Sequence, residues 1–233
     1  MTTTPALTDT ADPLVLDRLR SLDTCAVSDA LDSLGLPGAV TGIAPMWAAP
    51  GVTVGRVRTV KAVPAGGDGP STHIASPLVA VAGTGDVVVV DNDGRTDVSC
   101  WGGLLAEAAT VRGVAGVVVD GACRDVQECE QLGLPLFARA AVPVSARGRI
   151  VQRAMDVPVS VGGVTVESGD WLVADRNGLA FIPNGRLDDV LAAGLRIVER
   201  ERLMGEAVRA GRSVVDVMHD AQFTAARFQE PTS

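Results

Sequence analysis

An arginine and an aspartate stand side by side near the middle of the chain, at the end of the segment Asp120-Gly121-Ala122-Cys123-Arg124-Asp125. The guanidinium of Arg124 can hold a carboxylate through two parallel hydrogen bonds, and the Asp125 carboxylate is a hard oxygen ligand suited to Mg²⁺ or Mn²⁺. An Arg-Asp dipeptide is ordinarily a solvated surface pair. These residues therefore indicate chemistry only if other groups converge on them.

A second candidate segment lies earlier in the chain, at Trp101-Gly102-Gly103-Leu104-Leu105. It opens a helical pattern, and the first N–H groups of a helix lack intrahelical partners. The amides of Gly102, Gly103, Leu104 and Leu105 are therefore candidates to receive a carboxylate or phosphate. The alternative is that the two glycines only form a tight turn.

The elements around these two segments are expected to bring them together. The run DVVVVD at 86–91 is typical of a strand buried on both faces, and we interpret the following NDGRTDVSC as a loop that leads into the helix. The strand GVAGVVVDG at 113–121 comes next, and ACRDVQECEQLG begins another helix. This order predicts a parallel sheet, in which both loops lie beyond the carboxyl ends of the strands and face one crevice.

The rest of the chain predicts a mixed α/β protein without a separable second domain. Gly162-Gly163 separates two alternating runs as a hairpin turn would, which indicates a second, mostly antiparallel sheet after Pro135. The other predicted elements are helices from Pro13, over 24–33, over 71–82 and over 187–210, and a strand over 51–64. We expect a disordered N-terminus at 1–12, a single domain at 13–212 and a C-terminal tail or helix at 213–233.

The acidic composition limits the classes of partner. A formal net charge of -8 and a pI of about 4.7 argue against a nucleic-acid or anionic-membrane partner, because phosphate binding needs clustered Lys and Arg. No stretch is long and apolar enough to span a membrane, and the first residues lack the order of a secretory signal. We therefore expect a cytoplasmic protein whose partners are small molecules or proteins.

Cysteine, lysine and histidine are weak candidates for the chemistry. The four cysteines form no CxxC pair, and we expect them to be reduced and mostly buried. Lys61 is the only lysine, and its alternating context favours an exposed strand position over a Schiff-base role. His73 and His219 are too far apart in sequence for a zinc motif, so a hard metal with oxygen ligands fits better.

The segment GLLAEAATVRGVAGVVVDGACRD resembles the signature of the RraA-like family, and the similarity runs from about Thr24 to Asp216. That family includes 4-hydroxy-4-methyl-2-oxoglutarate and 4-carboxy-4-hydroxy-2-oxoadipate aldolases, oxaloacetate decarboxylases and the regulator of ribonuclease E activity. The resemblance implies a three-layer β/β/α swivelling-domain fold. It also implies additional N- and C-terminal helices that bind neighbouring subunits into a homotrimer or homohexamer.

The resemblance also assigns roles to the two central residues. It implies that Arg124 binds the carboxylate and oxo group of a pyruvyl moiety, and that Asp125 anchors Mg²⁺ or Mn²⁺ mainly through the water shell of the ion. The aldolases that the chain resembles have an Asp, then twenty residues, then Arg-Asp; here Gly103 takes the place of that Asp. That carboxylate is expected to position water or relay a proton in retro-aldol cleavage. Decarboxylation of oxaloacetate needs no base for a hydroxyl proton and therefore tolerates the loss better.

Other carboxylates are candidates to replace the missing one. Asp97 and Glu107 are close in sequence, and Glu199 and Glu201 of the closing helix are candidates from a neighbouring subunit by resemblance alone. Each of these is ordinarily a solvated surface charge.

Together with these residues, the resemblance implies a divalent-metal-dependent lyase that acts on a 2-oxo acid, by retro-aldol cleavage or by oxaloacetate-type decarboxylation. Two alternatives remain open. One is a non-catalytic protein-binding regulator, similar to the ribonuclease E regulator. The other is an enzyme in which Gly103 enlarges the pocket for a bulkier acid.

Overall fold

The β-branched runs form the centre of the molecule, as their composition predicts. The structure is a computed structural model that describes residues 11–66 and 72–220. Its elements in chain order are α1 (Pro13–Arg20), α2 (Thr24–Ser33), β1 (Ala39–Val40), β2 (Ala44–Pro45), β3 (Thr53–Pro64), α3 (Ser76–Val81), β4 (Asp86–Ser99), α4 (Gly103–Val111), β5 (Gly116–Cys123), α5 (Val126–Gln131), β6 (Leu136–Ala141), β7 (Ile150–Met155), β8 (Val159–Val161), β9 (Val164–Val166), β10 (Trp171–Asp175), β11 (Gly178–Ile182), the 3₁₀ helix η1 (Asn184–Arg186), α6 (Leu187–Arg209) and α7 (Val214–His219).

One mixed sheet contains most of the strands in the described residues. Its order is β1-β11-β10-β3-β4-β5-β6-β2, and β7 pairs with β3 beside this path. The four central strands, β3 to β6, are parallel to one another, and the other pairs are antiparallel. β1 and β2 stand at opposite ends of this order, yet only three residues separate them in the chain. The sheet therefore curls until its edges approach, which gives it a parallel wall and an antiparallel wall.

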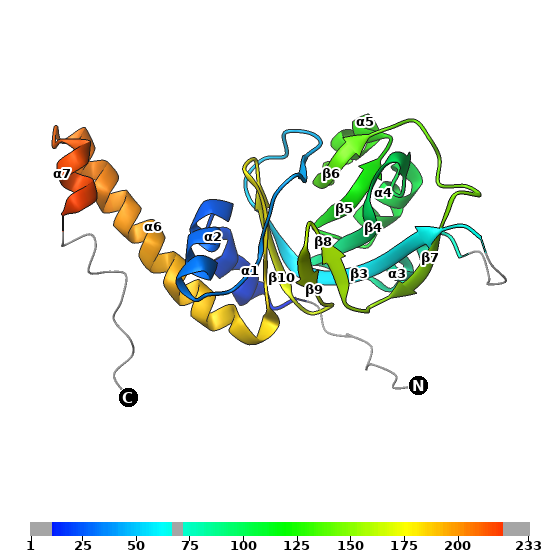
Figure 1. Cartoon of the computed structure of the whole chain (residues 1–233), viewed down its shortest axis with the longest axis horizontal. Coiled ribbons are helices and arrows are strands. Elements are labelled where there is room, and N and C mark those ends of the chain that lie inside the picture. The colour runs from blue at the N-terminus through cyan, green and yellow to red at the C-terminus, as the bar shows by residue number, and fades with distance from the viewer. Residues whose placement is uncertain (1–10, 67–71, 221–233) are drawn as a thin grey trace.

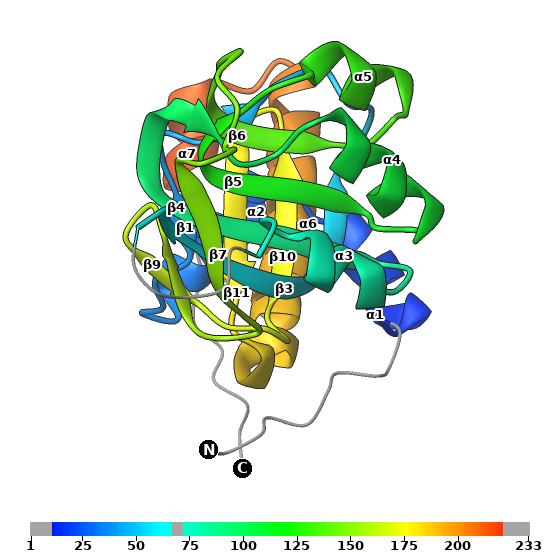
Figure 2. The ribbon, with the colours of Figure 1, turned by 90° about the vertical axis from the view of Figure 1, so that its right-hand side faces the viewer.

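Side chains alternate between two cores along the parallel strands. On β4, Val87 and Val89 point between the two walls, whereas Val88 and Val90 point into an outer core beneath α3, α4 and α5. Both faces of the strand are buried, which explains why DVVVVD has no polar residue between its two aspartates. Figure 2 shows α3, α4 and α5 gathered on one side of the parallel strands.

A different group of helices covers the antiparallel wall. α1, α2 and α6 pack on the outer faces of β10 and β11, where Trp171 and Val173 meet Leu19, Val27 and Leu191. Beyond this core, α6 extends away from the sheet and carries α7 at its end (Figure 1). The predicted α/β fold with additional N- and C-terminal helices is confirmed, and the predicted helix over 187–210 corresponds to α6.

The predicted loop after Asp91 is wrong, because β4 continues to Ser99. Asp93 and Gly94 adopt positive φ angles of 57° and 68° within the strand, and the ladder between β4 and β5 shifts register there. Polar residues with a glycine suit an irregular strand as well as a turn, so composition alone did not distinguish them.

The predicted second antiparallel sheet is also wrong as stated. Among the described strands, only the hairpin β8–β9 forms a separate sheet, and its turn at Gly162-Gly163 is confirmed. β6, β10 and β11 join the main sheet instead. Alternation predicts a half-buried strand but does not identify the strand that it pairs with. The predicted helix over 71–82 is shorter, at Ser76–Val81, because left-handed Ala75 precedes it.

Parts of three predictions lie outside the described residues. They are residues 1–10 of the predicted disordered N-terminus, Ser71 of the predicted third helix and residues 221–233 of the predicted tail. Within the described ranges, Asp12 accepts a hydrogen bond from the Leu14 amide at the start of α1. In those ranges, no helix has the length and apolar character required to cross a membrane.

Candidate active site

The two predicted segments meet because β4 and β5 are parallel neighbours. Backbone pairing continues past the end of β4: the Cys100 amide donates to the Ala122 carbonyl at 3.0 Å, and the Arg124 amide donates to the Trp101 carbonyl at 3.0 Å. The turn that begins at Trp101 therefore lies beside the Arg124-Asp125 pair. The parallel strand order thus brings these groups to one edge of the sheet, as expected.

Asp125 links the two segments through its side chain. Its Oδ2 accepts a hydrogen bond from the Gly103 amide at 2.9 Å and lies 3.2 Å from the Nε of Arg124. The residue has left-handed backbone angles, φ 56° and ψ 40°, a conformation that Asp adopts more readily than most residues. Asp125 thus caps α4 from the neighbouring loop. Its Oδ1 accepts no hydrogen bond from the described residues.

Gly102 makes this close approach possible. A Cβ atom on Gly102 would lie 2.8 Å from the Asp125 Oδ2 and 3.0 Å from the Arg124 Nε, so any side chain there would displace the pair. Of the four amides predicted to receive a ligand, that of Gly103 is taken by Asp125. Leu104 and Leu105 follow in the first turn of α4, where amides have no intrahelical acceptor.

A second carboxylate, which the sequence interpretation missed, borders the same glycine turn. Glu128 stands on α5, and a Cβ atom on Gly103 would overlap its Oε2 and lie 2.7 Å from its Cδ. The Glu128 carboxylate therefore occupies the volume that a side chain at Gly103 would need. Within the described residues it has no hydrogen-bond or ion-pair partner. The signal available in the sequence was its position in the first turn of the helix that follows the Arg124-Asp125 pair.

The site is open on one side and closed on the other. The side chains of Arg124 and Asp125 are 42% and 31% exposed, whereas Trp101 beneath them is buried. Cys129 and Cys123 lie in the same buried core, and burial raises the pKa of their thiols to about 11 and about 12. These thiols stay protonated near neutral pH, so the reactive groups of the site are Arg124 and the two carboxylates.

The site's oxygen donors fit a hydrated hard cation better than an enclosed one. The described residues contain no cluster of three or more His, Cys, Asp or Glu side chains able to hold a metal ion. Asp125 offers an Oδ1 without a hydrogen-bond donor from the described part of the chain. Mg²⁺ retains several water ligands and is commonly held by one or two carboxylates, whereas structural Zn²⁺ needs four protein ligands.

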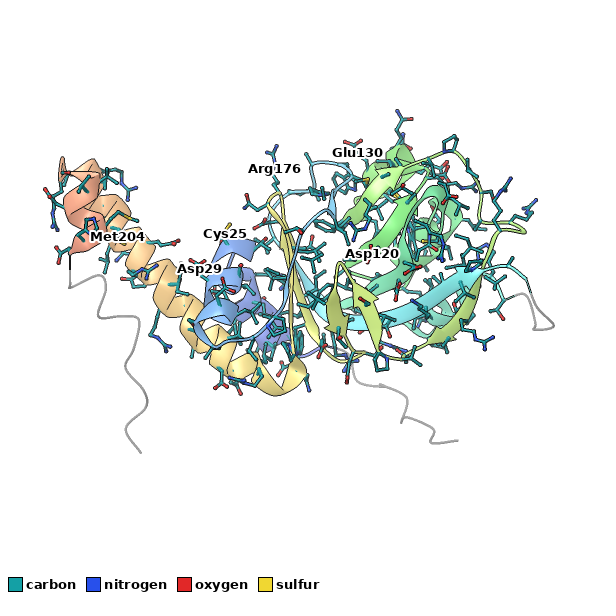
Figure 3. The ribbon with its side chains drawn as sticks, in the orientation of Figure 1. Cys25, Asp29, Asp120, Glu130, Arg176 and Met204 are labelled. Atoms are coloured by element: carbon teal, nitrogen blue, oxygen red, sulfur yellow. The ribbon has the colours of Figure 1, made fainter. Side chains whose placement is uncertain are left out.

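Within the described residues, no hydrogen bond or ion pair joins the side chains of the replacement acids suggested by the sequence to Arg124 or Asp125. Asp97 is exposed on β4, and Glu107 is exposed on α4. Glu199 lies on α6, where it forms an ion pair with Arg202 at 2.8 Å. Figure 3 shows Met204 on the extended part of α6, on the far side of the molecule from Glu130 of α5. Within one chain, α6 therefore lies across the sheet from α4 and α5.

Lys61 has a structural partner. Its Nζ lies 2.6 Å from the Oδ2 of buried Asp91, and its side chain is 34% exposed. Lys61 on β3 is therefore the ion-pair partner of a buried carboxylate. The predicted strand position is confirmed, but the side chain is half-buried rather than exposed. All four cysteines are free. Cys25 is exposed and the other three are buried, so the prediction of mostly buried cysteines is confirmed.

Comparison with protein families gives a match over most of the described fold. Residues 24–180 match the family model described as RraA-like, Aldolase/RraA. A putative 4-hydroxy-4-methyl-2-oxoglutarate aldolase of Halalkalibacterium halodurans is 33% identical over 207 residues, which cover 87% of this chain and 94% of that protein. Protein DlpA of Legionella pneumophila is 30% identical over 208 residues, and the match spans 89% of this chain but only 34% of DlpA.

Solved structures show the same fold. An uncharacterized protein from Pseudomonas syringae aligns with a TM-score of 0.80 at 30% identity, over 90% of this chain and 99% of that one. RraAS2 of Streptomyces coelicolor, described as an unusual member of the RNase ES inhibitor RraA protein family, aligns with a TM-score of 0.76 at 25% identity. That alignment covers 84% of this chain and 97% of RraAS2.

Proposed function

Because this chain belongs to the RraA-like family, we propose that it is a divalent-metal-dependent carbon–carbon lyase that acts on a 2-oxo acid. The observation that carries the proposal is the convergence of Arg124, Asp125 and the start of α4 at one partly exposed edge of the sheet. Relatives named as 4-hydroxy-4-methyl-2-oxoglutarate aldolases support the same reaction class.

Arg124 is the residue that binds the substrate. Its Nε faces Asp125, and its terminal nitrogens form no hydrogen bond with the described residues, so they can reach a ligand. A guanidinium binds the planar carboxylate and the adjacent oxo group of a pyruvyl unit through parallel hydrogen bonds. The amides of Leu104 and Leu105 add donors at a helix start, where negative charge is favoured. These groups fix the 2-oxo acid against the glycine turn.

Asp125 is the residue that holds Mg²⁺ or Mn²⁺, through its Oδ1 and the water shell of the ion. When bound, the cation supplies positive charge that stabilises negative charge on the 2-oxo oxygen. Arg124 contributes a second positive charge that is already in place before the reaction, so little reorganisation is needed. The Gly103 hydrogen bond keeps the Asp125 side chain in a fixed orientation.

Both candidate reactions break a bond to C3 of the 2-oxo acid. In decarboxylation of oxaloacetate, the bond between C3 and C4 breaks and carbon dioxide leaves. The electron pair of the broken bond stays with C3 and forms the enolate of pyruvate. In retro-aldol cleavage of a 4-hydroxy-2-oxo acid, a base removes the C4 hydroxyl proton, a carbonyl compound leaves, and the same enolate forms. Protonation at C3 then gives pyruvate in both cases. Arg124 stabilises the enolate oxygen whichever group departs.

The test is pyruvate release from oxaloacetate and from a 4-hydroxy-2-oxo acid, with and without EDTA. We expect EDTA to abolish turnover and added Mg²⁺ or Mn²⁺ to restore it. Asp125→Asn retains a left-handed residue and an acceptor for the Gly103 amide, and we expect a loss of about 100-fold in kcat. Asp93→Asn is the matched control, because Asp93 is also left-handed but is exposed and belongs to β4. Full turnover in the chelated enzyme or in Asp125→Asn would contradict the proposal.

We also propose a homotrimer or homohexamer. Leu104 and Val111 lie two helical turns apart on α4 and are 85% and 79% exposed, which leaves an apolar strip beside the site. If Glu199 or Glu201 takes part, it comes from a neighbouring subunit that covers this strip, because α6 lies across the sheet from α4 within one chain. Light scattering coupled to size exclusion tests this proposal. A monomer at micromolar concentration would contradict it.

A protein-binding regulator is the second candidate, because of the structural likeness to RraAS2. It predicts no pyruvate release from any 2-oxo acid, together with co-purification of a ribonuclease. An enlarged pocket for a bulkier acid is not favoured, because the Glu128 carboxylate fills the volume beside Gly103.

A further inference from the structure

Gly103 and Glu128 fit one another as a pair. Gly103 is buried at the first residue of α4, and Glu128 extends from α5 into the volume that the glycine leaves. A Cβ atom at position 103 would overlap the Glu128 Oε2. A side chain on Gly103 and the present position of Glu128 are therefore mutually exclusive.

The carboxylate that enters this volume lies beside the groups of the candidate site. Gly103 donates its amide to Asp125 at 2.9 Å, while its Cα faces Glu128, so both carboxylates border one residue. Glu128 is exposed and has no partner within residues 11–66 and 72–220, whereas Asp125 already accepts one hydrogen bond. A free, solvent-accessible carboxylate at this position can accept a proton.

We propose that Glu128 is the general base for retro-aldol cleavage in this chain, which rests on the proposed lyase function. The Glu128 carboxylate takes the proton of the C4 hydroxyl, directly or through one water. The O–H electron pair becomes the second bond of the departing carbonyl group, and the C3–C4 electron pair passes to the pyruvate enolate. The proton on Glu128 then returns to C3 and completes pyruvate. No oxidant, reductant or further reactant is required.

The role predicts a difference between the two reactions of one enzyme. Decarboxylation has no hydroxyl proton to remove, so it needs Arg124 and the cation but not Glu128. Glu128→Gln keeps the size of the side chain and removes the base. General-base catalysis contributes about 100-fold or more, so we expect kcat for retro-aldol cleavage to fall by about 100-fold. We expect decarboxylation of oxaloacetate to stay within about threefold of the wild-type rate, because this step uses no base.

Two further measurements separate this role from a structural or metal-binding one. Glu130→Gln changes another exposed acid on α5 (Figure 3), and we expect both rates to remain unchanged. Binding of Mn²⁺ to Glu128→Gln, measured by electron paramagnetic resonance, should match the wild type within about threefold. The double variant Gly103→Asp/Glu128→Ala moves the carboxylate to the other element. It should cleave the aldol substrate faster than Glu128→Ala alone.

The outcomes distinguish failure of this inference from failure of the proposed function. If the wild type releases pyruvate from neither acid, the lyase function fails and the role of Glu128 fails with it. If the wild type is active and Glu128→Gln cleaves the aldol substrate equally well, the role of Glu128 alone is overturned. Equal losses in both reactions, or loss of Mn²⁺ binding, also overturn it, because they make Glu128 a metal-anchoring or structural group.

Discussion

Two pairs of carboxylates differ in how many hydrogen bonds they accept from the protein. One pair lies on β4 and β5, and the other lies just beyond the end of β5. Asp91 and Asp120 face one another across the ladder of β4 and β5, and both are buried. Asp91 accepts hydrogen bonds from Lys61 and from two backbone amides. Asp120 accepts from Arg139 at 2.5 Å and from the Gly162 amide at 2.7 Å.

The second pair lies just beyond the end of β5. Asp125 accepts one hydrogen bond and Glu128 accepts none from the described residues, and Asp125 is a third exposed. The first pair holds the hairpin β8–β9 against the sheet, since the Ser160 and Gly162 amides are among its donors. A carboxylate whose lone pairs are filled by the protein stabilises the fold. One whose lone pairs remain open is available to a ligand or a proton.

The largest effect should come from breaking the satisfied pair. Asp91→Ala leaves Lys61 without its carboxylate and two backbone amides without acceptors, so we expect the free energy of unfolding to fall by about 3 kcal/mol. Urea denaturation measures it. Asp91→Asn retains an acceptor and should lose less. An unchanged urea midpoint in Asp91→Ala would show that the pair does not hold the hairpin.

The open site should respond in the opposite way. Arg124→Lys keeps the charge but loses the planar fork that binds a carboxylate at two points, so we expect kcat/KM to fall by about 30-fold, or about 2 kcal/mol. The side chain is 42% exposed, so the free energy of unfolding should change by less than about 0.5 kcal/mol. Steady-state kinetics and urea denaturation on the same preparation test both statements. A large stability loss with intact kinetics would place Arg124 among the structural residues.

Like Asp91 and Asp120, Asp156 accepts hydrogen bonds from other residues of the chain. Its ionisation makes the free energy of unfolding depend on pH. Burial raises the pKa of Asp156, but hydrogen bonds from Arg58 and Ser168 outweigh burial and hold the pKa below its ordinary value. The stabilisation is therefore complete above the ordinary Asp pKa and is lost as the pH falls through the lowered folded-state value. We expect the free energy of unfolding to fall as the pH drops below about 4. Urea titrations at several pH values test this, and Asp156→Asn should show a flatter dependence in the same range.

The sequence predicted the parts of this comparison that depend on local pattern. DVVVVD and GVAGVVVDG specify strands because both faces are buried, and parallel order alone placed Arg124 and Asp125 beside the glycine turn. The partners of Asp91 and Asp120 could not be predicted, because Ser160 and Gly162 are far away in sequence and only the curled sheet brings them close.

The short strands and Glu128 were missed for a related reason. β1 and β2 have two residues each, too few for any periodicity, and β7 shows no strict alternation of burial. Glu128 reads as an ordinary helix-surface acid. Its position becomes informative only when the missing Cβ of Gly103 is seen to make room for it, which requires α4 and α5 to be placed together.

The smallest effects should come from acids that are near the site in sequence but do not border its glycine turn. Asp97 and Glu107 are exposed and form no ion pair with the described residues, so Asp97→Asn and Glu107→Gln remove only solvated charges. We expect kcat for both reactions to stay within about twofold and the free energy of unfolding to change by less than about 0.5 kcal/mol. Parallel kinetics with Glu128→Gln measures the contrast directly. Suppose instead that Glu107→Gln lost as much retro-aldol activity as Glu128→Gln. Contact with the Gly103 turn would then not be the feature that identifies the base.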